Sequence, residues 1–293
     1  MLNKISLVVP TINRTIELKK LLESVKECDY AKLEVIIVDQ NTDIDISNIV
    51  NYFKEYFPIN HIKVNFKGAA KARNYGVRYA TGDIINFPDD DCELSKDLLS
   101  KVNNIFNEDT NNELIFGRSL DRNSMQASIV NFYKSSVSVR YSNIYRSTVE
   151  FTMFIKKNVF EELGGYDEEL GVGTYFGAEE GADLVIRALS KSKKIMYYPD
   201  LLFYHPEKIN KYGVNECLRG LSYARGAGAL AYKHICINKN IHVFKLIIYI
   251  NLKAMAAIII YFFTFKFKKS RYYLYVLFGR IQGFFKKLKL VFQ

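Results

Sequence analysis

Apolar runs of strand length alternate with amphipathic stretches over the first third of the chain, and this alternation constrains the fold more than any other feature. Short runs rich in Val and Ile predict buried strands, while apolar residues at helical spacing predict helices. Elements that alternate in this way form βαβ units around a mainly parallel sheet. We therefore predict an α/β, Rossmann-like sheet flanked by helices. The predicted strands are residues 5–10, 33–39, 61–66 and 83–88, and the predicted helices are residues 15–27, 49–57 and 68–80.

Three consecutive carboxylates, Asp89, Asp90 and Asp91, follow the fourth predicted strand in the stretch INFPDDDCEL. Asp39 ends the second predicted strand. Parallel sheets bind ligands beyond the carboxyl ends of their strands, so these acids would face one crevice. Clustered carboxylates are costly there without a cation, and Mg²⁺ or Mn²⁺ takes oxygen ligands that it shares with phosphates. The alternative is a solvated loop in which Asp91 or Ser95 caps the next helix.

Charge is distributed unevenly along the chain. The formal net charge is +10, but the last acidic residue is Glu216, and residues 217–293 contain 14 Lys and Arg. The first 216 residues hold all 31 acidic groups and 27 basic ones, which gives a net charge of −4. This asymmetry suggests that the rear of the chain contacts a polyanion or an anionic membrane.

The rear of the chain also contains long apolar runs. Residues 243–265 are strongly apolar, but Lys245, Asn251 and Lys253 interrupt them. A spanning helix needs about 20 mostly apolar residues, and the uninterrupted run at 254–265 is shorter. This favours an interfacial or re-entrant helix, while a span with Lys245 at its edge remains open.

Residues 266–290 mix Lys and Arg with Tyr, Phe and Leu, a composition typical of helices that lie on a bilayer surface. We predict that residues from about 240 to 293 contact a membrane. Nucleic-acid binding is the less favoured interpretation, because a nucleic-acid face has no need of continuous apolar runs. Burial against a partner subunit is a third interpretation, so the oligomeric state stays open.

The four cysteines show no CxxC spacing, which predicts reduced thiols and no zinc site. The first apolar run, residues 5–10, is too short for the apolar region of a signal peptide. Both features predict a chain that stays in a reducing compartment.

Six motifs occur in the order and spacing seen in glycosyltransferase family 2, which the chain resembles over about residues 4–206. The resemblance implies a GT-A fold and an inverting, metal-dependent enzyme that uses a nucleotide sugar. The motifs are VVPTINR (8–14), VIIVDQN (35–41), AAKARNYGV (69–77), FPDDDC (87–92), GGYDEELGVGTYFGAEEGADLVIRAL (164–189) and YHP (204–206).

The resemblance implies how the donor is bound. Asp39 would hydrogen-bond the base, uracil or thymine, and Arg73 would approach the diphosphate. The alternatives are a strand-end turn former at Asp39 and a helix-surface charge at Arg73. The first loop around the nucleotide would contain Pro10, Thr11, Asn13 and Arg14.

The resemblance also identifies FPDDDC as the DxD motif. It implies that Asp91 binds the metal directly and that Asp89 takes the ribose or a metal-bound water, while Asp90 also contacts the ribose. His205 corresponds to a late-loop metal or phosphate ligand in some members, although a His before Pro is as often structural.

An acidic pair that opens a late helix supplies the general base in this family. Here the pair is Glu179 and Glu180, and Glu180 is the preferred base with Glu179 next. The chain departs from the family pattern, because aligning on Asp183 places Gly181 where an aspartate usually stands. The alternative is that both acids only complement the helix dipole.

These features predict a catalytic domain at residues 1–215, with a nucleotide-sugar half at 1–100 and an acceptor half at 101–215, and a helical, basic, membrane-associating region at 216–293. We expect transfer from a UDP or dTDP sugar to a hydroxyl of a glycan or lipid-linked glycan in bacterial surface polysaccharide synthesis. The location would be the cytoplasmic face of the inner or plasma membrane, peripheral or weakly integral. The alternatives are a nonenzymatic membrane-associated binding protein on a degenerate transferase fold and a nucleotidyltransferase.

Overall fold

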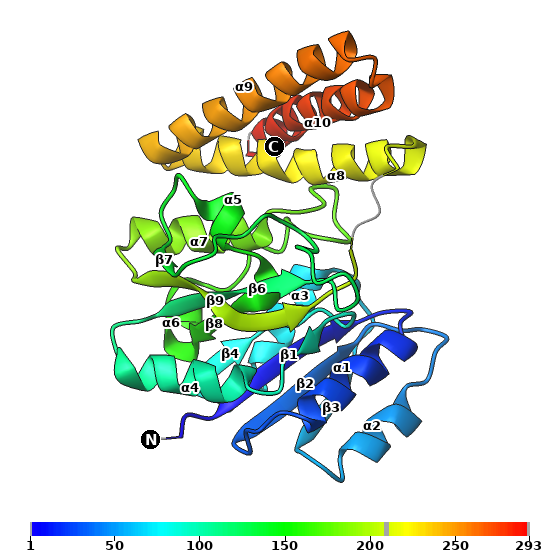
Figure 1. Cartoon of the computed structure of the whole chain (residues 1–293), viewed down its shortest axis with the longest axis vertical. Helices are drawn as coiled ribbons and strands as arrows, with labels where there is room; N and C mark the ends of the chain where they lie inside the picture. The colour runs from blue at the N-terminus through cyan, green and yellow to red at the C-terminus, as the bar shows by residue number, and fades with distance from the viewer. Residues whose placement is uncertain (1, 208–210, 292–293) are drawn as a thin grey trace. The chain divides into compact units, whose positions relative to one another are not determined.

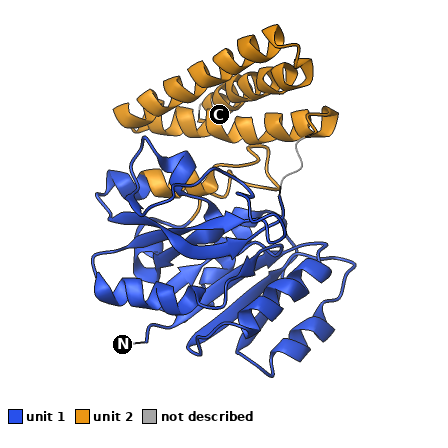
Figure 2. Cartoon of the chain, in the orientation of Figure 1, with its two compact units in different colours: residues 1–165, 187–208 blue, residues 166–186, 209–293 orange. Residues whose placement is uncertain are grey.

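A computed structural model describes residues 2–207 and 211–291. The chain forms two compact units (Figure 2). The first contains residues 1–165 and 187–208, and the second contains residues 166–186 and 209–293. The boundary at residue 215 stays a prediction.

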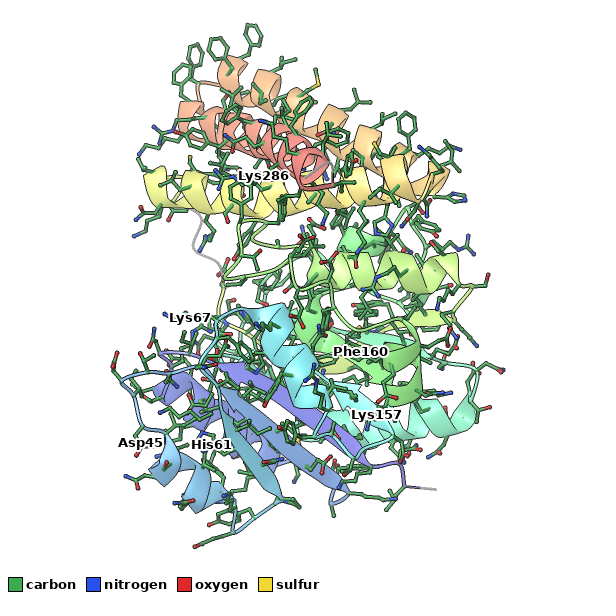
Figure 3. All side chains as sticks on the ribbon, turned by 180° about the vertical axis from the view of Figure 1, so that it is seen from behind. Asp45, His61, Lys67, Lys157, Phe160 and Lys286 are labelled. Carbon is green, nitrogen blue, oxygen red and sulfur yellow. The ribbon has the colours of Figure 1, made fainter. Side chains whose placement is uncertain are left out.

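The seven predicted strands and helices of the front of the chain are all present, with ends shifted by a few residues. The strands pair in parallel in the order β3-β2-β1-β4. Views from opposite sides place α1 and α2 on one face of these strands and α3 on the other (Figures 1 and 3). The elements are β1 Ile5–Thr11, α1 Ile16–Lys26, β2 Leu33–Asp39, α2 Ser47–Phe53, β3 Ile59–Lys63, α3 Ala69–Val77 and β4 Ile84–Asn86.

Burial on both faces explains the apolar strand sequences. Every residue of β1 is buried, because helices cover the two faces of the sheet. Helix α1 buries Leu18, Leu21, Leu22 and Val25 on one side, at the spacing of an amphipathic helix. Helix α3 approaches the strands through a glycine: a Cβ at Gly76 would lie 2.5 Å from Val8 Cγ1 and 2.9 Å from Val38 Cγ2.

The rest of the sheet is mixed, so the parallel part is largely the first four strands. Beyond β4 the order is β8-β6-β9-β5, with β7 paired to β9; only β6 and β9 pair in parallel. The fold is α/β with one large sheet, as predicted. The remaining elements of this unit are β5 Glu93–Leu94, α4 Leu98–Glu108, β6 Leu114–Leu120, β7 Val137–Ser138, α5 Ile144–Ser147, a 3₁₀ turn Glu150–Thr152, β8 Met153–Lys156, α6 Lys157–Glu162 and β9 Ile195–Tyr204.

The second unit is helical. Glycines bring α8 and α10 close together, because a Cβ at Gly279 or Gly283 would collide with the α8 backbone at Leu221 or Arg225. Helix α10 also bonds α9: Arg280 Nη1 donates to Ile250 O at 3.0 Å and to Asn251 Oδ1 at 2.9 Å. The elements are α7 Glu180–Ser190, whose last turn belongs to the first unit, α8 Val214–Ala231, a π-helix Tyr232–Ile237, α9 Ile241–Phe263 and α10 Phe267–Val291.

Within the described residues, α9 is the one helix whose length and composition would allow it to cross a membrane. Of the residues in its most apolar 18-residue stretch, 11% are buried. Its exposed apolar side chains recur every three or four residues. They include Phe244, Ile248, Leu252, Met255, Ile259 and Phe262.

The substitution Gly76→Ala tests the packing of α3. Alanine favours a helix over glycine by about 1 kcal/mol, but overpacking a dense core costs about 1–3 kcal/mol. Since the added methyl would meet two buried valines, we expect overpacking to exceed the gain in helix propensity and to lower the free energy of unfolding by up to about 2 kcal/mol in urea denaturation. The control Lys71→Ala changes an exposed position of the same helix. Wild-type stability in Gly76→Ala would contradict the close approach.

Candidate functional site

The carboxyl ends of β1, β2 and β4 meet at one edge of the sheet, and polar side chains gather there. Thr11, at the end of β1, donates through Oγ1 to Asp90 Oδ2 at 2.8 Å. Arg14, in the loop after β1, donates through Nη1 to Asp90 Oδ1 at 2.8 Å and lies 2.5 Å from Asp91 Oδ2. Residues far apart in sequence are thus brought together because parallel strands end at the same edge.

A second arginine reaches the same acidic triplet from α3. Arg73 Nη2 lies 2.7 Å from Asp89 Oδ1, and Arg73 is 3% exposed. The residue is therefore not a solvated charge on the helix surface. Two guanidinium groups thus offset most of the charge of three neighbouring carboxylates.

The three aspartates differ in their surroundings. Asp90 is buried, which raises its pKa to about 6, although the charge of Arg14 and the bond from Thr11 act in the opposite direction. The side chains of Asp89 and Asp91 keep more exposure, 35% and 17%. Solvent-borne ligands can therefore reach Asp89 and Asp91 more readily than Asp90.

A divalent cation fits this set of donors. Ligand atoms of Asp89, Asp91 and Cys92 all lie within 4.8 Å of one another. Cys92 is fully buried, and burial raises the pKa of its thiol well above the usual value, which favours the neutral thiol over the thiolate form that binds metals. The two carboxylates are the oxygen ligands that Mg²⁺ and Mn²⁺ prefer.

His205 brings a nitrogen beside one of these carboxylates, Asp91. Its Nε2 lies 3.5 Å from Asp91 Oδ1, and its Nδ1 donates to Pro206 O at 2.8 Å. In the neutral ring, Nε2 therefore carries a lone pair toward the carboxylate. Two acceptors that face each other fit a cation held between them. The ring also stacks on Phe151, which fixes its orientation.

The end of β2 carries a second polar group. Asp39 is 1% exposed and accepts bonds from Asn41 N at 2.9 Å and Asn41 Nδ2 at 2.7 Å. His61 Nε2, on β3, lies 2.9 Å from the other carboxylate oxygen (Figure 3 labels His61). The backbone N–H of Asn13 donates to Asn41 Oδ1 at 2.6 Å, and Asn13 adopts φ +58°.

Sequence reasoning missed His61 and Asn41. Asn41 stands inside the VIIVDQN motif, so its position beside Asp39 was a usable signal. His61 faces Asp39 only through the pairing of β2 with β3, in which Ile37 lies opposite His61. Pro10 lies within buried β1, one residue before the polar edge begins.

The acidic pair lies in the second unit. Glu179 adopts φ +82°, and Glu180 opens α7 with 5% exposure. Gly171 has φ +100°, and a Cβ there would lie 2.8 Å from Glu180 Cδ. The glycine-rich loop thus closes directly on the Glu180 carboxylate, which no side chain at residue 171 would permit.

Comparisons with known proteins identify the family and the fold. The sequence model described as Glycosyl transferase family 2 matches residues 6–160. A curated relative from Campylobacter jejuni, GalNAc(5)-diNAcBac-PP-undecaprenol beta-1,3-glucosyltransferase, is 29% identical over 189 residues, which cover 59% of this chain and 60% of the relative. The match therefore spans less than two thirds of that relative's length.

Two solved structures share the fold. The mannosyltransferase PcManGT from Pyrobaculum calidifontis, in complex with GDP-Man and Mn²⁺, has a TM-score of 0.64 and 16% identity, over 98% of this chain and 88% of that one. S. aureus TarS 1–349, in complex with UDP-GlcNAc, has a TM-score of 0.62 and 17% identity, over 96% of this chain and 92% of that one.

Proposed function

The chain belongs to glycosyltransferase family 2 and has the GT-A fold, and we propose that it transfers a sugar with inversion from a UDP- or dTDP-sugar to a hydroxyl of a glycan or lipid-linked glycan. The observation that carries this proposal is the cluster of Arg14, Arg73 and the aspartate triplet beside Asp39. A nucleoside diphosphate carries an anionic diphosphate and a nucleobase. The sheet edge offers arginines, carboxylates that can hold a cation, and Asp39 as a hydrogen-bond acceptor for the nucleobase. The Campylobacter relative's name specifies a polyprenyl-diphosphate glycan, which supports an acceptor in polysaccharide synthesis.

Asp39 supports the choice of donor base. A carboxylate only accepts hydrogen bonds, so it favours a base that presents an N–H group at that edge, as N3 of uracil or thymine does. Asn41 and His61 hold the two carboxylate oxygens in place. Pro10, Thr11, Asn13 and Arg14 would form the neighbouring wall of the nucleotide site.

Asp89, Asp91 and His205 would hold the divalent cation. A bound Mg²⁺ or Mn²⁺ neutralises negative charge on the diphosphate leaving group as a Lewis acid. Arg14 and Arg73 lie on the same carboxylates and can donate charge-assisted hydrogen bonds to phosphate oxygens. Asp90 would contact the ribose from the buried side of the triplet.

Glu180 is the proposed general base, with Glu179 as the second candidate. The acceptor hydroxyl must lose its proton as it attacks, and a positioned carboxylate can take it. The Glu180 side chain is held at the start of α7 against Gly171, which gives it a defined position.

The two alternative functions have distinct products. A nucleotidyltransferase releases pyrophosphate, whereas a glycosyltransferase releases a nucleoside diphosphate, so mass spectrometry of the products separates them. A nonenzymatic binding protein would release neither with any donor and acceptor pair.

We propose that helices α9 and α10 lie parallel to a membrane surface and contact one leaflet. Two contacts favour this position over a span: Arg280 donates to the backbone near the middle of α9, and α10 packs on α8. Helix α8 carries Glu216, Arg219 and Arg225, which are costly in a bilayer core. The apolar side chains of α9 would instead enter one leaflet, with the Lys and Arg of α10 at the headgroups (Lys286 is labelled in Figure 3). A cytoplasmic leaflet rich in anionic lipid fits this charge.

Asp91→Asn tests the metal site. We expect manganese-dependent binding of UDP, measured by calorimetry, to weaken at least tenfold, because the amide cannot neutralise the cation. Binding without metal should change little. The matched control is Asp200→Asn, at an exposed position on β9. If both variants bind Mn²⁺–UDP like the wild type, Asp91 is not a ligand.

Glu180→Gln tests the base. Loss of a general base lowers turnover by about 10²–10⁴-fold, and we expect that range for kcat with a donor dissociation constant within twofold of wild type. Glu55→Gln alters an exposed acid in the turn after α2 and serves as the control. Normal kcat in Glu180→Gln would remove it from this role and leave Glu179 to be tested in the same way.

Leu252→Glu and Ile259→Glu test the membrane face. Burying a Leu or Ile side chain contributes about 1.5–3 kcal/mol. Each change should therefore lower the partition coefficient onto vesicles of phosphatidylglycerol and phosphatidylcholine at least tenfold, as measured by flotation. Leu2→Glu, exposed in the first unit, is the control. Because the helix would lie in one leaflet, carbonate at high pH should release the wild-type protein from membranes. Retention after carbonate treatment would indicate a span.

A further inference from the structure

A charged network in the second unit lies outside the site described above. It joins Asp167, Asp183, Lys233 and His234, which are contributed by the loop before α7, by α7 itself and by the π-helix that continues α8. Asp183 has 0% exposure and His234 has 1%. Buried charges of this kind persist only when they are paired, so each member depends on the others.

One carboxylate oxygen is the centre of the network. Asp183 Oδ1 lies 2.8 Å from Lys233 Nζ and 2.8 Å from His234 Nε2. On the other side of the ring, Asn238 Nδ2 lies 3.2 Å from His234 Nδ1. An amide nitrogen only donates, so Nδ1 accepts and Nε2–H donates to Asp183. The histidine is thereby neutral, and Lys233 provides the positive charge.

Lys233 also binds a second carboxylate. Its Nζ lies 2.6 Å from Asp167 Oδ2, so one ammonium group bridges Asp167 and Asp183. Asp167 belongs to the loop that contains Gly171, and Asp183 lies three residues after Glu180 on α7. The Glu180 carboxylate lies against Gly171. Lys233 therefore joins the helix that carries Glu180 to the loop that its carboxylate touches.

Two further contacts fix the same loop to the C-terminal helices. Lys287 of α10 forms an ion pair with Glu169. On α8, a Cβ at Gly226 would collide with the backbone of Ala178, immediately before the acidic pair. The loop, the acidic pair and the helices are thus one packed body, in which Lys233 is the central cation.

We infer that Lys233 is a positioning residue for Glu180, and that the C-terminal helices hold the base in place as well as contacting lipid. The inference rests on the proposed role of Glu180 as the general base. Lys233 does not touch substrate; it fixes the loop of residues 167–176 against α7, and the loop fixes the carboxylate.

The experiment measures steady-state transfer and UDP binding with Mn²⁺ in the full chain carrying Lys233→Met. We expect kcat to fall about 10- to 100-fold, with the dissociation constant for Mn²⁺–UDP within twofold of wild type. Lys233→Arg keeps the charge and should recover most of the loss. Lys20→Met, exposed on α1, is the control. Since Lys233→Met leaves Asp183 with one partner fewer, Asp167→Asn provides a milder variant that removes the charge from the loop's contact with Lys233 and leaves the Lys233–Asp183 pair in place.

A double substitution separates positioning from general destabilisation. If Lys233 acts through Glu180, then adding Lys233→Met to Glu180→Gln should lower kcat no further. Additive losses, or normal kcat in both Lys233→Met and Asp167→Asn, would overturn the inference. Retained turnover in Glu180→Gln alone would instead overturn the base itself, so the two failures are distinguishable.

Discussion

Compensation of buried negative charge by fixed cations is the interaction on which this structure depends. Three adjacent aspartates repel one another, and burial raises the pKa of Asp90 to about 6. Arg14 and Arg73 reach them from two different elements, and Thr11 adds a neutral donor. The same rule supports the proposed donor site, because the proposed cation and the diphosphate would add charges of both signs to a cluster that already holds both.

Parallel pairing of the first four strands determines where this compensation can occur. The strands β1, β2 and β4 end side by side, so loops distant in sequence share one edge. The antiparallel strand β8 then pairs with β4 and continues the sheet beyond the triplet. The mixed half of the sheet carries His205 at the end of β9, which reaches Asp91 because β9 returns toward the same edge.

The sequence predicted the parallel half of the fold, because Val- and Ile-rich runs and amphipathic helices have clear periods. It also predicted the acidic cluster, because the aspartates directly follow predicted parallel strands. It predicted no strand beyond β4: β5 and β7 have two residues each and carry no period, and β6, β8 and β9 were not identified either. His61 was missed for a different reason. Its role depends on the register between β2 and β3, and no local pattern encodes that register. Similarly, Asp183 and Lys233 meet across fifty positions of sequence through helix packing alone.

The basic residues of the acid-free segment 217–293 fall into two groups: those that face outward and those that bind partners inside the second unit. Counting the charges of this segment suggests that they all serve an anionic surface, at about 1 kcal/mol for each Lys or Arg near lipid. Yet Lys233 and Lys287 pair with acids of the segment before α7, and Arg280 binds the backbone of α9. Those cations are occupied within the unit, so in the proposed membrane contact only the outward Lys and Arg would face lipid. The acids that balance the rear lie in residues 166–186, which belong to the same compact unit although they precede it in sequence. The charge asymmetry along the chain is therefore smaller within the folded unit, and part of it holds the proposed base in position.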